Sequence, residues 1–213
     1  MPGEPRQAAE EAYLSALAYQ TLYSGVLERL GERTGQDLSG LRSAFQTADA
    51  AAPGFLLCLT KALLAKSELG LNLEEAFLRL QAQAPAEDFQ LAHPEAPFQE
   101  LSSRALALRR ILARIPDQIS DRRAFLEIIK EIASSIKKLL DATNNIYHLV
   151  PLNAQGSVER RKKEFVSRSK RFSNTLKEYF KGEEAAAVFV SANHLIFHIS
   201  LIIRTVRERA PVN

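Results

Sequence analysis

Between residues 125 and 146 the chain reads FLEIIKEIASSIKKLLDATNNI. Its apolar residues recur at three- and four-residue steps, the period of one face of an α-helix. The stretch therefore predicts the central part of a long helix over about residues 117–147. The residues that we expect this helix to turn toward a core are Phe125, Ile128, Ile129, Ile132, Ile136, Leu139, Leu140, Thr143 and Ile146.

The same period continues on both sides of this helix, and no convincing strand pattern interrupts it. We expect a helix over about 98–114, another over 158–180 and a last one over 183–209. Pro116, the Pro151 to Gly156 region and Gly182 mark the breaks between them. Long helices joined by short loops pack as an antiparallel four-helix bundle, which we predict for residues 98–213.

The N-terminal part is also predicted to be helical. We expect a loose tail over 1–9, a helical domain over 10–69 and a linker with a helix over 70–97, which makes the whole chain all-α. Asn72 and Glu75 form a cap pair that predicts where the linker helix starts. About sixty residues in short helices bury little core, so we predict that 10–69 forms a dimer. Packing against the C-terminal half is the alternative.

Composition limits the classes of protein. Apolar residues make up 46% of the 213 residues, and no apolar run reaches the roughly 18 residues that span a bilayer. The N-terminus lacks the apolar segment of a secretory signal. Cys58 is the only cysteine, which fits a reducing, cytosolic setting, and its leucine-rich surroundings predict a core position.

Charge is distributed unevenly along the chain. Residues 1–97 hold 7 Lys and Arg against 13 Asp and Glu, whereas 98–213 hold 21 against 12. The basic half could meet acidic peptides or anionic phosphoinositides. The densest run, Arg160 to Lys163, has no interleaved stacking aromatics, so no nucleic-acid partner is expected.

Two lysine-bearing stripes lie beside the predicted core stripes. On the helix quoted above this stripe is Lys130, Ala133, Ser134 and Lys137, and on the next helix it is Val166, Lys170, Ser173 and Lys177. If the helices lie side by side, small residues form a shallow apolar floor and lysines form its rim. Such a groove suits an amphipathic acidic helix. The alternative is close helix packing with solvated lysines.

Signals for chemistry are weak. His194 and His198 share a helix face at a spacing that can bind zinc, but no third ligand is evident. No phosphate-binding glycine loop or serine-nucleophile elbow is present. We therefore expect no enzymatic activity, no cofactor and no metal.

Several segments resemble the programmed cell death 10 family, also called the cerebral cavernous malformation protein three family. They include the run from Phe98 through Pro116, 129–145, 169–180 and 188–193, with weaker likeness through 14–80. The resemblance implies an N-terminal dimerisation domain and a C-terminal bundle similar to the focal adhesion targeting domain. It further implies homodimers, or heterodimers with Ste20-like germinal-centre kinases. Positions that match the family's dimer contacts are Leu41, Ala44, Leu63 and Leu64.

The resemblance also implies that the bundle docks leucine-aspartate motifs of paxillin, a similar motif in malcavernin, and striatin. It implies roles in kinase signalling, Golgi organisation, apoptosis and vascular integrity, in the cytoplasm with Golgi and peripheral plasma-membrane association. The linker 81–97, the loop 148–157 and the tail 204–213 depart from the family pattern. Positions that match the family's groove are Lys130, Ala133, Ser134, Ile136, Lys137, Val166, Ser169, Lys170, Ser173 and Lys177.

Overall fold

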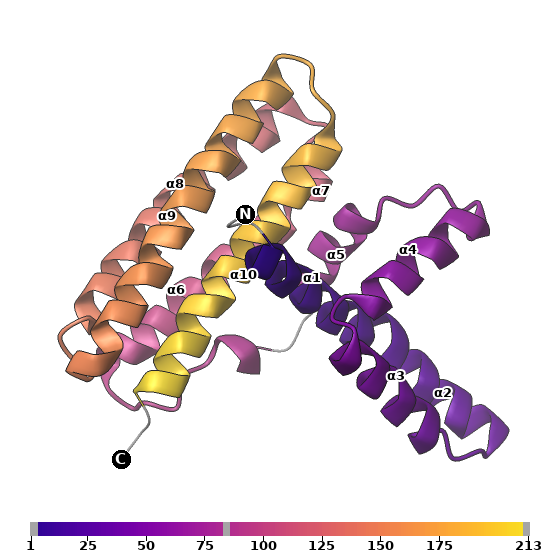
Figure 1. Ribbon diagram of the computed structural model, residues 1–213. Coiled ribbons are helices and arrows are strands. Elements are labelled where there is room, and N and C mark those ends of the chain that lie inside the picture. The colour runs from indigo at the N-terminus through magenta and orange to yellow at the C-terminus, as the bar shows by residue number, and fades with distance from the viewer. Residues whose placement is uncertain (1–3, 83–85, 211–213) are drawn as a thin grey trace. The chain divides into compact units, whose positions relative to one another are not determined.

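The computed structural model is helical throughout most of the residues that it describes, 4–82 and 86–210 (Figure 1). The chain divides into two compact units, one ending at Phe77 and the other beginning at Leu78. The division falls within helix α5 (Leu73–Gln81), inside the range 70–97 that the sequence analysis assigned to a linker with a helix. Each unit is described by itself.

The first unit contains α1 (Glu4–Ala18), a π-helical turn η1 (Tyr19–Ser24), α2 (Gly25–Thr34), α3 (Ser39–Ala51) and α4 (Phe55–Ser67). A loose tail was predicted over residues 1–9. Residues 1–3 lie outside the described residues, and residues 4–9 belong to α1, which begins at Glu4. Residues 6–9, Arg-Gln-Ala-Ala, are good helix formers, and Pro5 is tolerated in the first turn of a helix, which explains the early start. One predicted helix over 10–30 is interrupted by η1.

Polar side chains of α1 and α3 hold the start of α4. The Asp49 carboxylate accepts hydrogen bonds from Ser15 Oγ at 2.6 Å and from the Leu56 N–H at 3.1 Å. Ser15 Oγ accepts one from the Leu57 N–H, also at 3.1 Å. Gly54, which precedes α4, has no side chain to cap the helix and has a φ of 94°. Ser15 and Asp49 therefore satisfy donors that a local cap would otherwise bind.

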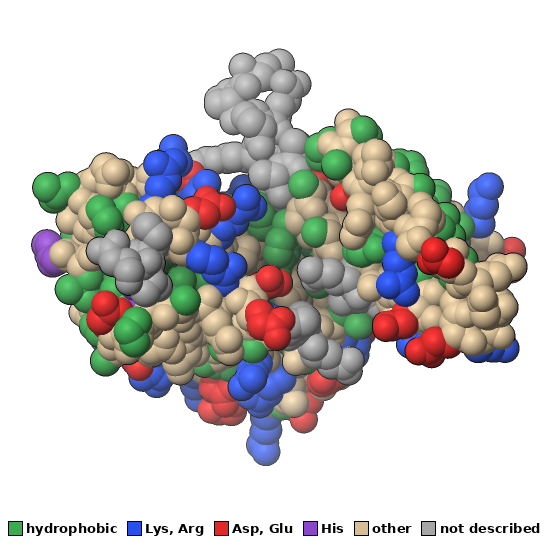
Figure 2. Space-filling view, turned by 90° about the horizontal axis from the view of Figure 1, so that it is seen from below, with side chains coloured by type: hydrophobic (Ala, Val, Ile, Leu, Met, Phe, Trp, Pro, Cys, Tyr) green, Lys and Arg blue, Asp and Glu red, His purple; other side chains and the backbone are tan. Residues whose placement is uncertain are grey.

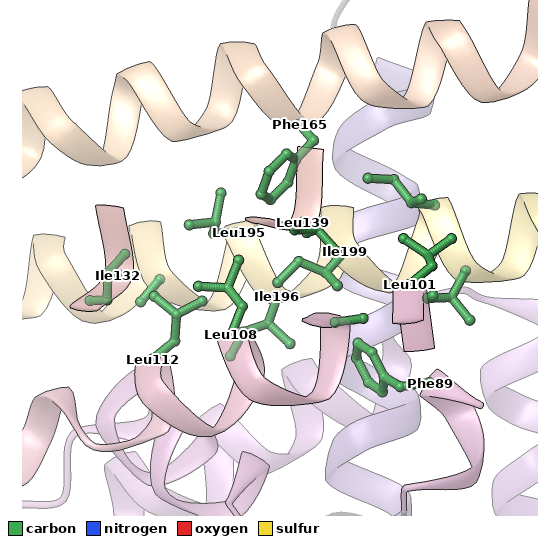
Figure 3. Packing of buried hydrophobic residues seen from close by; sticks show 14 of the residues in the cluster. Phe89, Leu101, Leu108, Leu112, Ile132, Leu139, Phe165, Leu195, Ile196 and Ile199 are labelled. Carbon is green, nitrogen blue, oxygen red and sulfur yellow. The ribbon is translucent and has the colours of Figure 1, made fainter. Parts of the chain in front are cut away.

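The second unit is the predicted bundle of four long helices, α6 (Ala96–Ala113), α8 (Arg122–Ile146), α9 (Leu152–Phe180) and α10 (Ala185–Arg209), with the short α7 (Ile115–Gln118) between the first two. Helix α6 packs along α8, α9 packs along α10, and α6 contacts α10. Their buried side chains form one apolar core, part of which is drawn in Figure 3. All core residues predicted on α8 are buried or partly buried.

Two helix starts differ from the prediction. Helix α8 starts at Arg122 rather than near 117, because the Asp121 carboxylate accepts hydrogen bonds from the N–H groups of Arg123 and Ala124 at 2.8 and 3.1 Å. Such an N-cap begins a new helix. Helix α9 starts at Leu152, before the predicted Val158, and runs through Gly156. Glycine costs only about 1 kcal/mol within a helix, which the surrounding turns tolerate.

Helix α10 is the most buried of the bundle helices. Its length and hydropathy alone would allow it to cross a membrane, but 61% of its most apolar stretch is buried inside the unit. Burial of this kind is ordinary for the central helix of a bundle. The apolar character of α10 is thus explained by the core that it completes.

The described residues between α5 and α6 are mostly not helical. In its described residues after α5 it contains the 3-10 turn η2 (Glu87–Phe89), and α6 then begins at Ala96. The Asn72 cap is observed, since its Oδ1 accepts a hydrogen bond from the Glu75 N–H at 3.0 Å. The prediction that Cys58 is a core residue is wrong, because its side chain lies on the exposed side of α4.

Candidate peptide-docking groove and dimerisation surface

The lysine-bearing stripe of α8 lies outside the core, next to it. Lys130, Ala133, Ser134 and Lys137 are exposed, whereas Ile136 is partly buried. The neighbouring residues Ile132 and Leu139 are in the core. The period of the quoted sequence therefore separates a buried face from a polar one, as predicted.

Helix α9 shows the same division. Lys170, Ser173 and Lys177 are exposed, and Val166 and Ser169 are partly buried. The hydroxyl of Ser169 donates to the Phe165 carbonyl at 2.9 Å, so this serine is satisfied within its own helix. The predicted core residues Phe165, Phe172 and Leu176 are buried, and Tyr179 is partly buried.

Contacts at both ends fix the register of α8 against α9. At one end Lys162 Nζ donates to Asn144 Oδ1 at 3.1 Å. At the other end the centre of the Phe125 ring lies 5.5 Å from that of Tyr179 and 5.7 Å from that of Phe180. Between these ends the two helices run antiparallel (Figure 1).

When residues are counted along α8 and α9 from the contacts at either end, the two lysine-bearing stripes fall at the same level of the helix pair. Ala133 falls within about one residue of the level of Ser173, and Lys137 within about one residue of Ser169. The two helices approach each other closely over less of their length than α6 and α8 or α9 and α10 do. Small residues thus face each other across the most open pair of neighbouring helices in the bundle.

Partly buried apolar residues lie beside the two stripes and would form the floor of the candidate groove. They are Ile136 and Leu140 on α8 and Val166 on α9. The sequence analysis missed two further apolar residues, Leu126 and Phe180, each 42% exposed and level with each other at the far end. From Leu126 to Leu140 the floor is about 21 Å long at 1.5 Å per residue, or roughly four turns of a bound helix.

The lysines of the rim are available to a ligand. Lys130 Nζ lies 2.7 Å from Glu127 Oε1, but both side chains are largely exposed, so the pair is weak. Within residues 4–82 and 86–210, no acidic side chain lies within ion-pair distance of Lys137, Lys170 or Lys177. Their charges can therefore attract an acidic partner.

The predicted dimer residues lie on an open apolar surface of the first unit. Leu41 and Leu63 are 43% and 54% exposed, Ala44 is exposed, and Leu64 is partly buried. Helix α3 buries none of its residues within the chain. A helix with an uncovered apolar face is typical of an interface.

A hollow adjoins this surface. Leu64 lines an open cavity of about 490 Å³ between the end of α4 and the start of α5, together with Leu71 and Leu73. The sequence analysis did not identify Leu71, which is 60% exposed. Apolar side chains of a second chain could fill this cavity.

Both parts of the chain match sequence models of one protein family. Residues 11–70 match the family model described as programmed cell death protein 10, dimerisation domain, and residues 71–163 match the one described as its C-terminal domain. The chain is 50% identical over 208 residues to the programmed cell death protein 10 homolog of Caenorhabditis elegans. This alignment covers 94% of the chain and 97% of the relative.

Proposed function

The chain belongs to the programmed cell death protein 10 family, and on that premise we propose that it is a non-enzymatic adaptor. It has the family's dimerisation domain over residues 11–70. In the proposal this domain forms a homodimer or pairs with Ste20-like germinal-centre kinases. The C-terminal bundle then docks a second class of partner in the groove between α8 and α9.

The alignment of the two lysine-bearing stripes on α8 and α9 carries the proposal. An apolar floor about four turns long, bounded by lysines on both sides, suits an amphipathic helix with leucines on one face and carboxylates beside them. The lysines speed and orient docking more than they raise affinity. Leucine-aspartate motifs such as those of paxillin, malcavernin and striatin have this chemistry.

The groove is tested with a fluorescent leucine-aspartate peptide and the full-length chain. We expect saturable binding, and we expect Lys130→Asp or Lys170→Asp to weaken it roughly fivefold, the effect of about 1 kcal/mol. Lys138→Asp is the matched control, because Lys138 lies on the same helix but outside the stripe. A peptide that fails to bind, or an equal loss in Lys138→Asp, contradicts the groove.

The family resemblance extends the proposal to the cell. We propose that the protein acts in kinase signalling, Golgi organisation, apoptosis and vascular integrity. We also propose that it acts in the cytoplasm, in association with the Golgi and peripherally with the plasma membrane. Proteins that co-purify with the full-length chain test these assignments.

A second candidate function is direct binding to anionic phosphoinositides. The exposed cations Arg160, Lys163 and Arg171 on the outer side of α9 favour it. On the face that Figure 2 shows, Lys and Arg side chains of the bundle, at the left of the view, are interspersed with Asp and Glu, and this mixed charge weighs against it. Co-sedimentation with anionic vesicles should then fall steeply with salt, and absence of pelleting at low salt would exclude this function.

A further inference from the structure

Residues 87–93, which we call the strap, lie against α6 and the last turns of α10. Phe89, Leu91 and His93 are buried, whereas Gln90 and Ala92 between them are exposed. This alternation is that of an extended peptide whose every second side chain points inward. Figure 3 shows Phe89 entering the same apolar cluster as Leu101.

Side chains of the bundle bind the main chain of the strap. Arg207 Nη2 lies 2.9, 3.0 and 2.8 Å from the carbonyl oxygens of Glu87, Asp88 and Gln90. It thereby holds the end of the 3-10 turn.

Helix α6 binds the next residues in the same way. Gln99 Nε2 donates to the carbonyl oxygens of Leu91 and His93, and Ser102 Oγ accepts from the Leu91 N–H at 3.0 Å. Main-chain hydrogen bonds combined with alternate buried side chains are the mode by which proteins recognise extended peptides.

The buried side chains at both ends of the strap also make specific contacts with the bundle. The Arg109 guanidinium lies 4.7 Å from the centre of the Phe89 ring, a cation–π contact. The His93 ring stacks on Phe98 at 4.1 Å, and its Nε2–H donates to the Ala210 carbonyl. The strap is thus bound in the way that a peptide ligand is bound, with its side chains in pockets and its backbone in polar contacts.

An open hollow of about 490 Å³ adjoins the strap along α6. The strap supplies Gln90 and Leu91 to one wall, while Leu106 and Ala107 form an apolar floor and Arg110 lies at the rim. The strap leaves this space empty. A longer peptide could fill it and place a carboxylate near the Arg110 guanidinium.

We infer that α6 and the last turns of α10 form a second peptide-binding site, which the chain's own strap occupies. Its partner is an extended protein segment with an aromatic and an aliphatic residue two positions apart, and an acidic residue within reach of Arg110. The tethered strap competes with any partner at a high effective concentration, on the order of millimolar. A partner therefore binds measurably only when the strap is loosened or when the partner gains the extra contacts of the hollow. The site differs from the α8–α9 groove, which takes a helix.

The test uses a fluorescent peptide with the sequence of residues 86–95 and full-length protein. Phe89→Ser with Leu91→Ser weakens the strap and leaves the side chains of α6 and α10 unchanged. We expect this variant to bind the peptide at least roughly tenfold more tightly than the parent chain does, because the internal competitor is weakened. Adding Arg207→Gln should abolish the gain, because Arg207 belongs to the site and not to the strap.

Two controls accompany the strap variant. Ala92→Ser changes an exposed strap position and should behave as the parent chain, and a peptide with serine in place of both anchors should not bind. If the double variant does not fold by circular dichroism, Leu91→Ala carries the same comparison with a smaller gain. Equal or absent binding by the folded strap variant overturns the inference.

Discussion

Glu208, near the end of α10, keeps its charge to a lower pH than an ordinary glutamate does. The hydrogen bond that Arg204 Nε donates to Glu208 Oε1 at 2.6 Å is the main reason why the pKa of this carboxyl is lowered. Its slight burial acts in the opposite direction, and the positive charges of Arg209 and of Arg161 on α9 add to the lowering. The Glu208 carboxylate thus lies in the field of basic side chains from both α10 and α9.

Removing this hydrogen bond should raise the pKa of Glu208. In Arg204→Gln we expect the carboxyl pKa to move toward its ordinary value of 4.5. Because the folded pKa is below the unfolded one, the pair stabilises the fold at neutral pH and ceases to do so as the pH falls through the folded pKa. NMR titration of the Glu208 side chain measures the shift, and Arg160→Gln serves as control. An unchanged pKa in Arg204→Gln would show that the hydrogen bond is not its cause.

Among the secondary-structure elements, the positions where helices start and end determine the geometry of the groove. Asp121 sets the first turn of α8, and the Phe125 ring that packs on α9 follows one turn later. Between α6 and α8 the chain makes the short α7 and a turn. The Asp121 carboxylate therefore fixes where the first of the two lysine-bearing helices starts.

We expect Asp121→Ala to lower the free energy of unfolding by about 1 kcal/mol, the usual cost of losing an N-cap. Asp121→Asn, whose side-chain oxygen can still accept the two N–H hydrogen bonds, should retain most of the stability. Urea unfolding followed by circular dichroism measures both variants. Equal destabilisation by alanine and asparagine would mean that charge, rather than capping, matters here.

The apolar period predicted the bundle helices well, because a period of 3.6 residues marks each buried face. Local signals were less informative where tertiary contacts override them. The mostly polar residues from Asp117 to Arg123 were assigned to the first turns of one long helix, so the Asp121 cap was missed, and Gly156 suggested a loop where α9 is already formed. The prolines around the strap indicated a linker, yet Phe89 is buried through contacts with residues distant in sequence.

The groove could be predicted as two stripes, but not as a surface. Spacing alone cannot show that α8 and α9 are neighbours, nor that their ends are in register. Leu126 and Phe180 were not identified as part of the groove, since an exposed leucine and a helix-terminal phenylalanine have no distinctive pattern in sequence. Only the three-dimensional arrangement shows that they are level.

At the scale of the whole molecule, the two units differ in how completely they bury their apolar residues. The bundle closes around one core, whereas the first unit leaves large leucines exposed on α3 and α4. A second chain that covers this surface would remove several leucine side chains from water. Each fully buried leucine contributes about 1.5–3 kcal/mol, so association would stabilise the unit substantially.

We expect Leu41→Asp with Leu64→Asp to prevent association, because both carboxylates would be buried without partners in an apolar interface. Light scattering should then report a mass of 23.7 kDa instead of twice that value. Gln46→Asp, on the opposite side of α3, is the control and should leave the dimer intact. An intact dimer in the double variant would place the interface elsewhere.

The contacts that align α8 with α9 lie on the helices themselves, at their two ends, and do not involve the loop that joins the helices. Residues inserted at the exposed His148 or Leu149 should therefore leave the lysines aligned, whereas Val150 of the same loop is buried in the core and has to keep its place. The same tolerance makes the loop near the exposed Leu149 a permissive position for grafting an epitope or a reporter.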